Sequence, residues 1–574
     1  MHAPQLETPT RQEILSLLHA RFGHRRFRPG QEDVLQALLT GRDVLALLPT
    51  GAGKSLVFQI ASQILPGLTI VVSPLLALMR DQEESLEERG VEVAVINSTL
   101  SESAAEAELA RVERGEARLL YVTPERFLDQ DFTEVVRKLP VSLLAVDEAH
   151  CVSEWGHSFR PAYLALGPAV RRLGRPIVLA LTATATPWVR RDIVEQLAMR
   201  DPEIVVRGCD RPNLFFSVQR VESDADEYRA LRRLLGPTDE AVDAGQAGAL
   251  IDDGRAAFAG PGIIYTATTK AARETAEWLR DWGIAADFYH GQRTKRDRAR
   301  VQDAFMAGEL RVIAATNAFG LGIDKPDVRF VIHRDVPASL EAYYQEAGRA
   351  GRDGDEAYCL LLFGTADLGR AAFLSGGGRL DRDDIGRICT ALVEHGELSP
   401  RKLAALSGLS ASVFLRVTSA LEHEGVVGRR RGRLRLLAAA CDADTVSLEA
   451  EERRRAYESS RLAMMRGYAE TAACRREYIM NYFGEAYDPS QCQMCDNSLT
   501  HTASVGQASV GQTPGNQAPD GPFSIGELVR HASWGQGLVE RTTADSVTVL
   551  FDDVGFKTLD VELVQRKGLL EPVP

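Results

Sequence analysis

Residues 44–55 read VLALLPTGAGKS, and this stretch decides the fold of the first part of the chain. A short apolar run, which suits a strand buried on both faces, leads into a glycine-rich turn. Gly51 and Gly53 let backbone N–H groups approach a phosphate closely, while Lys54 reaches the outer phosphates of a nucleotide. Ser55 is a ligand for Mg²⁺ in such loops. Because a helical pattern follows the turn, the stretch predicts a loop that binds nucleotide phosphates.

The same rhythm of apolar runs and helical patterns extends from residue 44 to about 182 and restarts at about 262. The first runs are VLALLP, LTIVVSP, RLLYVTP, SLLAVDE and PIVLALT, and the second are GIIYT, AADFYH, RVIAAT, VRFVIH and AYCLLLF. Runs dense in Val, Ile and Leu suit buried parallel strands with crossover helices between them. We therefore predict an α/β fold with two parallel-sheet lobes in tandem, residues 1–208 and residues 209–375. Residues 236–260 are predicted to be a flexible insertion.

The composition is that of a folded, acidic protein. The chain has 574 residues, with 67 Lys and Arg against 80 Asp and Glu, so its formal net charge is −13. With 45% apolar and 26% charged residues, it is not a mainly disordered, collagen-like or disulfide-scaffold protein. No apolar stretch approaches the roughly 20 residues that span a bilayer, and the N-terminus does not resemble a signal peptide. We expect a cytoplasmic protein with no membrane partner. The acidic total argues against a histone-like coat for nucleic acid but does not exclude a local basic track.

The last third of the chain predicts four smaller segments. Residues 379–438 combine three helical patterns with an apolar-basic stretch, which indicates a winged-helix-like domain. Residues 442–498 are helical and contain a cysteine cluster, residues 499–521 are a polar linker, and residues 522–574 read as short strands of a small β-barrel. Arginines of the predicted wing suit phosphate contacts, with a solvated face as the alternative: Arg429, Arg430, Arg431, Arg433 and Arg435.

A pair of acidic residues ends another apolar run. Asp147 and Glu148 lie in the sequence AVDEAH. Asp147 would hold Mg²⁺ through water, and Glu148 would polarise an attacking water. Adjacent carboxylates at a strand end repel each other unless a metal ion or water offsets the repulsion. A solvated turn is the alternative for the pair alone, but the phosphate loop upstream favours a hydrolytic site.

Two further motifs complete a nucleotide site. FRPGQ places Gln31 upstream of the phosphate loop, and a glutamine amide suits a bidentate contact with adenine. QEAGRAGRD, in the second lobe, contains Gln345, Arg349 and Arg352. Arginines supplied by a facing domain to a γ-phosphate form an arginine-finger arrangement, although such a motif alone is more often a solvated basic turn. Together the motifs predict ATP in the cleft between the lobes, with hydrolysis opening and closing that cleft.

The stretch after the acidic pair, HCVSEWGHSFRPAY, is rich in aromatic and polar residues. Trp155 and Phe159 are suited to stacking on unpaired bases, because every base presents a π-face. His150, His157 and Arg160 lie close enough in sequence to relay DNA contact to the acidic pair. Core packing is the usual role of a Trp and a Phe, but the flanking residues are too polar for a core strand. We predict a loop that senses DNA.

The ordered set of motifs resembles the RecQ family of DNA helicases. The set is FRPGQ, PTGAGKS, SPLLALMRDQ, TPERF, DEAHCVSEWGHSFRPAY, LTATAT, DRPNLFF, ATNAFGLGIDKPDVRFVIH and QEAGRAGRDG, within residues 20–363. The resemblance implies two RecA-like lobes that bind and hydrolyse MgATP, with Thr182 and Thr184 coupling them. The first lobe would contribute Arg28 and Gln31 at the adenine, and Thr50, Gly51, Gly53, Lys54, Ser55, Asp147 and Glu148 at the phosphates and Mg²⁺. The second would contribute Gly322, Asp324, Gln345, Arg349 and, as the finger, Arg352.

The resemblance also implies an activity. The chain would load on single-stranded DNA, move 3′→5′ and unwind duplex DNA in recombination and repair, as a cytoplasmic, nucleoid-associated enzyme. Two alternatives remain: an RNA helicase on the same two lobes, and a nucleic-acid binder that ATP switches without unwinding. The aromatic-rich loop and the DEAHC sequence favour DNA, and the intact Lys54, Glu148 and Arg352 argue against a switch alone.

The cysteine cluster departs from the family pattern. The family uses four cysteines as Zn²⁺ ligands, whereas this chain has Cys474, Cys492 and Cys495 followed by Ser498. Structural zinc normally takes four nitrogen or sulfur ligands, and serine is a poor one. The resemblance therefore implies a Zn²⁺ site that His501 or water completes, and ordinary buried thiols are the alternative.

The C-terminal units raise two further points. The family usually places its winged helix after the zinc module, whereas the winged-helix-like region here precedes it, so its role in duplex engagement does not transfer directly. Residues 522–574 are similar to small Tudor-like barrels appended to some bacterial helicases. Trp534, on a predicted loop, suits a contact with another molecule. The balanced charge of this segment favours a protein partner over DNA.

Overall fold

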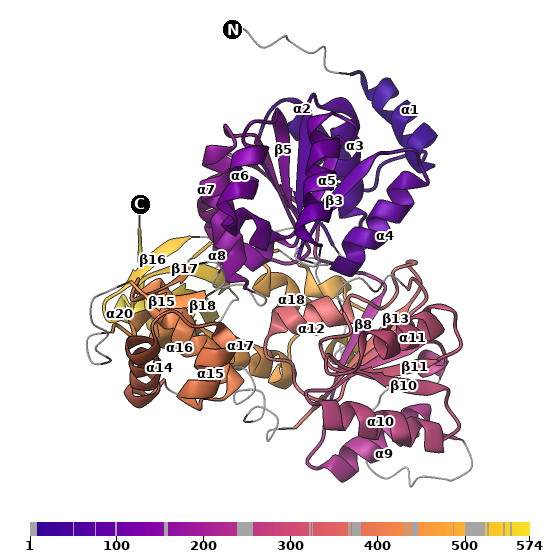
Figure 1. Ribbon diagram of the computed structural model, residues 1–574. Helices are drawn as coiled ribbons and strands as arrows, with labels where there is room; N and C mark the ends of the chain where they lie inside the picture. The colour runs from indigo at the N-terminus through magenta and orange to yellow at the C-terminus, as the bar shows by residue number, and fades with distance from the viewer. Residues whose placement is uncertain are drawn as a thin grey trace.

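The computed structural model describes residues 9–573 apart from residues 50, 75, 98–99, 154–158, 238–255, 321–322, 324, 365–368, 370–379, 431–432, 438–442, 444–445, 486, 500–522, 525–526, 543–545 and 552–553. The described chain forms two parallel sheets, a helix–hairpin unit, a pair of helices and a terminal antiparallel sheet (Figure 1). Most of the predicted insertion and linker therefore lies outside the described residues. Among the helices of the described ranges, none is long and apolar enough to cross a membrane.

The first lobe is built on a parallel sheet in the order β3-β4-β2-β5-β6-β1-β7. Its strands are β1 (Val44–Leu47), β2 (Leu68–Val72), β3 (Val93–Ile96), β4 (Leu119–Val122), β5 (Val141–Val146), β6 (Ile177–Thr182) and β7 (Glu203–Val206). Its helices are α1 (Arg11–Phe22), α2 (Gln31–Leu39), α3 (Lys54–Ile64), α4 (Leu76–Glu87), α5 (Glu102–Glu113), α6 (Gln130–Val136), α7 (Leu166–Arg172) and α8 (Pro187–Gln196). All five predicted runs form strands, and the structure adds the edge strands β3 and β7. Alternate strand residues enter two hydrophobic clusters on opposite faces, which explains why the runs are continuously apolar.

Three neighbouring strands of this sheet carry predicted site residues at their carboxyl ends. β6 pairs with β5 on one side and with β1 on the other. Gly51 lies in the loop after β1, Asp147 follows β5 directly, and Thr182 is the last residue of β6. Because carboxyl ends of parallel strands meet at one edge of a sheet, the topology brings these three segments together.

The second lobe is built on a parallel sheet in the order β10-β11-β9-β12-β13-β8. Its strands are β8 (Leu214–Arg220), β9 (Gly262–Tyr265), β10 (Ala286–Tyr289), β11 (Val312–Ala315), β12 (Phe330–His333) and β13 (Ala357–Phe363). Its helices are α9 (Asp224–Leu235), α10 (Thr269–Asp281), α11 (Lys295–Met306) and α12 (Leu340–Ala347). The prediction of two parallel-sheet lobes in tandem is confirmed, and β8 is an edge strand that the sequence did not reveal.

A helix–hairpin unit (residues 381–436) follows the second lobe. It consists of α14 (Arg382–His395), α15 (Pro400–Ser407), α16 (Ala411–His423), β14 (Val427–Arg430) and β15 (Arg433–Leu436). The two strands pair antiparallel, so the three predicted helices and the predicted hairpin are all present. On β15, Leu434 is buried in the core of the unit, whereas its neighbours Arg433 and Arg435 are exposed. The hairpin therefore presents these two arginines to solvent.

Two helices then return to the second lobe. They are α17 (Glu449–Glu470) and α18 (Arg475–Tyr482). The Tyr468 hydroxyl donates a hydrogen bond to the Tyr343 hydroxyl on α12 at 3.0 Å, in a buried contact. An isolated β-bridge joins Phe216 of β8 to Cys495. The helix pair and the cysteine cluster thus share one hydrophobic core with the second lobe.

The terminal sheet has the order β19-β18-β17-β16-β20. Its elements are β16 (Leu528–His531), β17 (Gly535–Thr542), β18 (Ser546–Phe551), β19 (Gly555–Asp560), α20 (Val561–Lys567) and β20 (Glu571–Pro572). Within the described part of this segment, no ladder joins β19 to β20, so the predicted closed barrel stays a prediction. Trp534 stacks on His531 with ring centroids 3.9 Å apart. The sheet lies beside α8 of the first lobe, as the yellow strands in Figure 1 show.

Candidate functional site

The predicted phosphate loop has the backbone that its glycines require. Gly51 and Gly53 have φ values of 83° and 71°, in the left-handed region that favours glycine. Gly53 is the N-cap of α3, so the loop ends at a helix N-terminus. Lys54 begins that helix, and its ammonium donates to the Leu48 carbonyl at 3.3 Å.

In the acidic pair, Asp147 is buried, Glu148 is half-buried, and the two carboxylates repel each other. Asp147 is 6% exposed, and its carboxylate accepts the Glu148 N–H at 3.0 Å. Burial and repulsion from Glu148 raise the pKa of Asp147, while the nearby Lys54 ammonium opposes the rise. Glu148 has a φ of 49°, which costs backbone energy in a residue with a side chain. The fold therefore holds two carboxylates beside a lysine in a place where a cation would relieve their repulsion.

His150 links the acidic pair to the end of β6. Its Nδ1 atom lies 3.0 Å from the Thr182 hydroxyl and 3.4 Å from a Glu148 carboxylate oxygen. The Thr182 hydroxyl in turn donates to the Thr184 carbonyl at 3.1 Å. Burial and the Lys54 charge lower the pKa of His150 to about 3, so the imidazole is neutral at physiological pH. These contacts join the DEAH segment to the LTATAT segment, which the resemblance assigned to coupling.

Ser55 contacts a residue, Gln82, that sequence analysis did not assign to the site. Its hydroxyl accepts a hydrogen bond from the Gln82 amide at 2.9 Å. The Gln82 carbonyl oxygen accepts from the Tyr121 hydroxyl at 2.6 Å. Gln82 lies in the motif SPLLALMRDQ, so its position in a family motif was the available signal. The chain of contacts orients the serine that was predicted to hold Mg²⁺.

Arg28 and Gln31 contact the phosphate loop itself. The Arg28 guanidinium donates to the Gly51 carbonyl. The Gln31 amide donates to the Ala52 carbonyl at 2.8 Å and to the Gly53 carbonyl at 2.9 Å. Its oxygen accepts the Arg28 N–H at 2.9 Å. Gln31 thus braces the loop in this structure, and the adenine contact stays a prediction.

Arg352 of the second lobe lies against the phosphate loop of the first. A Cβ atom at Gly51 would stand 3.7 Å from Arg352 Cγ and 3.8 Å from Cδ. Arg352 also donates to the Ile323 carbonyl at 2.7 Å. Arg349 is 6% exposed, and a Cβ atom at Gly320 would lie 2.9 Å from its Nη2 atom. The lobes therefore meet at the phosphate loop, with the predicted finger arginine at the contact.

Several predicted contacts lie outside the described residues, namely Thr50, Trp155, His157, Gly322, Asp324 and His501. Phe159 and Arg160 are described, and both are half-buried. The Arg160 guanidinium donates to the Pro74 carbonyl at 3.2 Å, and the backbone N–H of Arg160 donates to the Cys151 carbonyl at 3.0 Å. Gln345 is half-buried on α12. Arg160 thus ties the segment after the acidic pair to the loop that follows β2.

The three predicted zinc-binding cysteines come together. Their sulfur atoms lie within 4.8 Å of one another, and Cys495 Sγ is 3.9 Å from both Cys474 Sγ and Cys492 Sγ. Tetrahedral zinc with sulfur at about 2.3 Å separates its sulfur ligands by about 3.8 Å, so the spacing fits the metal. Ser498 lies beside the cysteines, with its hydroxyl 3.0 Å from Cys495 Sγ.

The connection between the lobes, residues 207–213, is held by the segment that carries the cysteines. Arg476, which is 2% exposed, forms an ion pair with Asp210. Glu485 accepts the N–H of Cys209 with both carboxylate oxygens, at 2.8 and 2.9 Å. Neither contact was predictable from the local sequence, because each joins residues more than 260 positions apart.

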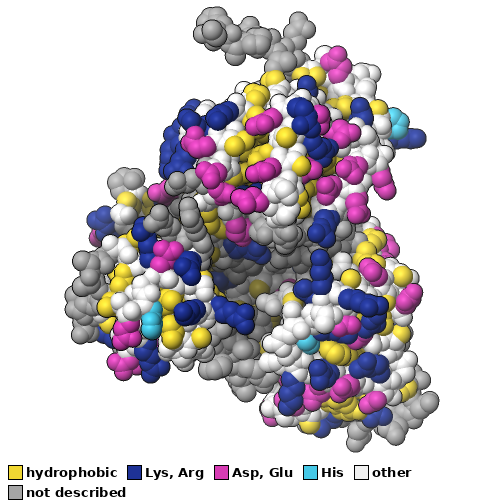
Figure 2. Space-filling model, viewed as in Figure 1, with side chains coloured by type: hydrophobic (Ala, Val, Ile, Leu, Met, Phe, Trp, Pro, Cys, Tyr) yellow, Lys and Arg dark blue, Asp and Glu magenta, His cyan; other side chains and the backbone are white. Residues whose placement is uncertain are grey.

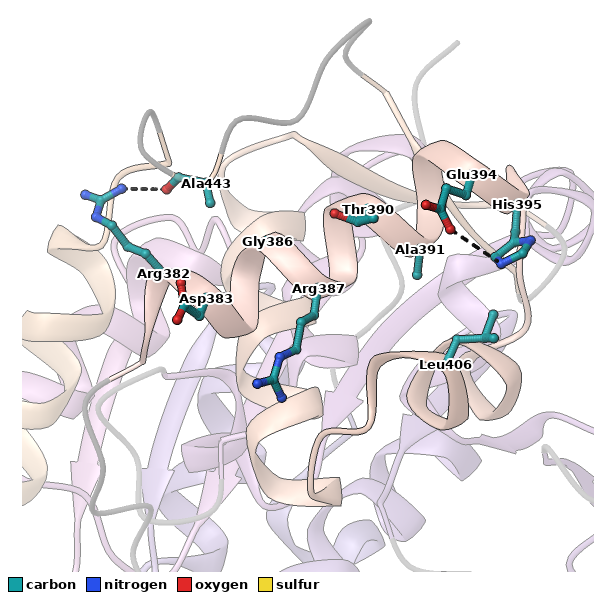
Figure 3. Close-up of a pocket in the computed structure, with 10 residues that line it drawn as sticks. All are labelled: Arg382, Asp383, Gly386, Arg387, Thr390, Ala391, Glu394, His395, Leu406 and Ala443. Atoms are coloured by element: carbon teal, nitrogen blue, oxygen red, sulfur yellow. Dashed lines mark hydrogen bonds and ion pairs between the residues drawn. The ribbon is translucent and has the colours of Figure 1, made fainter.

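A pocket of about 630 Å³ lies on the helix–hairpin unit, mainly along α14 (Figure 3). Arg382 donates to the Ala443 carbonyl at one end, and Glu394 lies 3.9 Å from His395 at the other. Of the predicted site residues that the structure describes, none lines this pocket. The nucleotide site is therefore built elsewhere, from the two lobes.

Comparison with protein families agrees with this arrangement. The model for the DEAD/DEAH box helicase family matches residues 28–192, which contain the phosphate loop and the acidic pair. The model for the helicase conserved C-terminal domain matches residues 249–354, which contain the arginine motif. The model for RecQ zinc-binding matches residues 433–499, which contain the cysteine cluster.

Comparison with curated proteins identifies relatives over most of the chain. Probable ATP-dependent DNA helicase RecS of Bacillus subtilis (strain 168) is 33% identical over 506 residues, covering 87% of this chain and 95% of RecS. ATP-dependent DNA helicase RecQ of the same strain is 41% identical over 364 residues, covering 62% of this chain and 57% of that protein. The RecQ protein of Pasteurella multocida (strain Pm70) is 33% identical, covering 86% of this chain and 63% of its own length. The chain thus spans nearly all of RecS and less than two thirds of either RecQ, and it belongs to the RecQ family of ATP-dependent DNA helicases.

Proposed function

We propose that this RecQ-family helicase hydrolyses MgATP between its two lobes, moves 3′→5′ along single-stranded DNA and unwinds duplex DNA in recombination and repair. The observation that carries the proposal is the contact between Arg352 of the second lobe and Gly51 of the first. It supports a site that draws a lysine and two acids from one lobe and an arginine from the other, as phosphoryl transfer requires. Opening and closing of that contact would drive movement along the strand.

The residues present fit ATP and Mg²⁺. Lys54 would hold the outer phosphates, while the Ser55 hydroxyl and the Asp147 carboxylate would hold Mg²⁺. A bound Mg²⁺ supplies charge neutralisation at the β- and γ-phosphates. The raised pKa of Asp147, caused by burial and by Glu148, supports this role because a cation would offset the repulsion. Glu148 would orient the attacking water, and the neutral His150 would keep the Glu148 side chain in place.

The surface supports a path for DNA. Figure 2 shows that one face is hollowed between the two lobes and the helix–hairpin unit, with Lys and Arg side chains around the hollow. The exposed Arg433 and Arg435 on β15 suit phosphate contacts of a duplex. Residues 379–438 would then act as a winged-helix-like domain, although they precede the zinc-binding region. A protein partner that binds residues 522–574 is still a prediction. The domain bounds given above are predictions as well.

The direction of movement is tested with tailed duplexes. We expect ATP-dependent strand separation of a duplex with a 3′ single-stranded tail and little separation of one with a 5′ tail. Strand separation is measured by a fluorophore–quencher pair, and ATP hydrolysis is measured with single-stranded DNA and with RNA. Unwinding of the 5′-tailed substrate alone would contradict the polarity. Stronger stimulation by RNA would favour the RNA-helicase alternative, and ATP-dependent binding without separation would favour the switch.

Trp155→Ala is expected to uncouple DNA binding from ATP hydrolysis. The indole would stack on an unpaired base, and a stacked base contributes about 1–3 kcal/mol. Stimulation of ATP hydrolysis by single-stranded DNA should fall at least about fivefold, while hydrolysis without DNA stays unchanged. Trp282→Ala is the matched control, because Trp282 lies on the second lobe and packs edge-to-face against Tyr228. Unchanged stimulation in Trp155→Ala would remove this residue from the DNA sensor.

The cysteine cluster would bind one Zn²⁺ per chain. Cys474, Cys492 and Cys495 supply three thiolates, and Ser498, water or His501 would complete the site. Metal analysis of the purified protein should find about one zinc per chain. Ser498→Cys should retain zinc longer against a chelator, because a fourth thiolate is a better ligand than a hydroxyl.

His501→Ala separates the two ways of completing the site. Loss of zinc from this variant would identify His501 as the fourth ligand, and retention would favour Ser498 or water. Absence of zinc from the unaltered protein, together with its uptake by Ser498→Cys, would mean that the site is lost in this chain.

A further inference from the structure

Glu540 is a buried acidic residue that the nucleotide site does not use. It lies on β17 of the terminal sheet, where the register with β18 shifts between Val539 and Arg541. Such an irregularity re-aims a side chain out of the normal alternation. The Glu540 side chain is directed at the first lobe, where its carboxyl accepts the N–H of Trp188 at 3.0 Å. Glu540 is only 1% exposed, so the contact is enclosed by protein.

The contact reaches the first turn of α8, which is held from a second side as well. Arg190 donates to the Ala185 carbonyl at 3.0 Å and to the Phe483 carbonyl, just after α18, at 2.5 Å. The Trp188 side chain packs against the core cluster that the second lobe shares with α17, α18 and the terminal sheet. The start of α8 is therefore fixed by the terminal sheet and by the zinc-binding region together.

The same helix packs directly on the acidic segment. α8 contacts the 3₁₀ turn Ala149–Val152, which follows Glu148. Asp192 on α8 also hydrogen-bonds the Ser153 side chain. Upstream, α8 begins at Pro187, directly after its N-cap Thr186, which is the last residue of the LTATAT segment. Thr182 of the same segment contacts His150. A displacement of the α8 N-terminus would thus reach the hydrolytic residues through two routes.

We infer that Glu540 is a positioning residue for ATP hydrolysis, which acts by fixing the N-terminus of α8 and through it the segment that contains Glu148 and His150. The inference rests on the proposed function, because it assumes that this segment hydrolyses ATP. It assigns the terminal sheet a role within the motor, whether or not the sheet also binds a partner.

The electrostatics of Glu540 support a neutral hydrogen-bonding role. Burial, with a smaller contribution from the nearby Glu341, raises the pKa of Glu540 to about 8, against the opposing effects of the Trp188 N–H and Arg190. Tyr457 of α17 also faces it. At neutral pH the carboxyl therefore carries its proton, and a glutamine amide of the same shape preserves the oxygen that accepts the Trp188 N–H.

The test compares Glu540→Leu, Glu540→Gln and a control in the same sheet. Thr548→Val is the control, because it removes a partly buried hydrogen bond between the Thr548 and Thr558 hydroxyls that lies within the sheet. ATP hydrolysis at saturating single-stranded DNA gives kcat and KM, and far-UV circular dichroism and thermal melting report folding. We expect Glu540→Leu to lower kcat about five- to tenfold, with KM for ATP changed less than about twofold. Glu540→Gln and Thr548→Val should keep the kcat of the unaltered protein.

The outcomes separate this inference from its alternatives. An unchanged kcat in folded Glu540→Leu overturns it, and so does an equal loss of kcat in Thr548→Val, which would mean that general stability of the sheet matters. If Glu540→Leu does not fold, Glu540→Asp withdraws the carboxyl from Trp188 by one methylene, and an unaltered kcat there overturns the inference. Absence of ATP hydrolysis from the unaltered protein would instead refute the proposed function.

Discussion

Lys54→Ala is expected to abolish ATP hydrolysis while leaving most of the binding to single-stranded DNA. The ammonium at the start of α3 is the group placed to hold the outer phosphates, and no other lysine lies in the glycine loop. Removing a preorganised charge at the reacting phosphates costs at least about 10²–10³-fold in kcat. ATP hydrolysis is measured by phosphate release, and DNA binding is measured by fluorescence anisotropy of a labelled strand.

Lys138→Ala is the matched control for this change. Lys138 is exposed on the same lobe, after α6, and should alter neither hydrolysis nor DNA binding. Persistent turnover in Lys54→Ala, at a rate near that of the unaltered protein, would mean that the phosphate loop has been assigned wrongly.

Arg352→Ala is expected to lower kcat by about 10³-fold with little change in nucleotide affinity. A finger arginine stabilises charge that develops in the transition state, and such residues contribute about 10³–10⁵ in kcat. In the structure the Arg352 side chain lies beside Gly51, on the phosphate loop of the other lobe. The measurements are ATP hydrolysis with DNA and the affinity for a fluorescent ATP analogue.

Arg352→Lys distinguishes a finger from a simple charge. Lysine keeps the positive charge but loses the planar fork that donates two hydrogen bonds, so only partial activity should return. Arg329→Ala is the control for a disturbance of the motif's loop alone, since Arg329 forms an ion pair with Asp353, the residue directly after Arg352. A loss of nucleotide affinity equal to the loss of kcat would show that Arg352 binds ATP rather than acting on its hydrolysis.

Much of the fold was predictable because the buried strands leave continuous apolar runs. The strands missed, β3, β7 and β8, all lie at the edges of their sheets. The glycine loop and the acidic pair were also predictable, since each consists of residues that are adjacent in the sequence. Gln31 was predicted to contact the adenine. Sequence did not reveal that its side chain also holds the phosphate loop, through the Ala52 and Gly53 carbonyls.

The contacts that sequence could not reveal are those between distant segments. Gln82 reaches Ser55 from another helix, and Glu540 reaches Trp188 across 352 positions. Nothing in the local pattern around Glu540 distinguishes it from an exposed strand carboxylate. Its partner is decided by how the terminal sheet docks on α8, and that docking depends on the packing of the whole protein.

The contacts of Arg476 and Glu485 with the connection between the lobes have a mechanical consequence. A connection held by a third segment permits a smaller rotation of one lobe against the other than a free linker does. In the proposed motor, this restraint would limit the opening of the cleft between the lobes from outside that cleft. If the neighbouring thiols hold zinc as proposed, removing the zinc should loosen the restraint before it unfolds the protein.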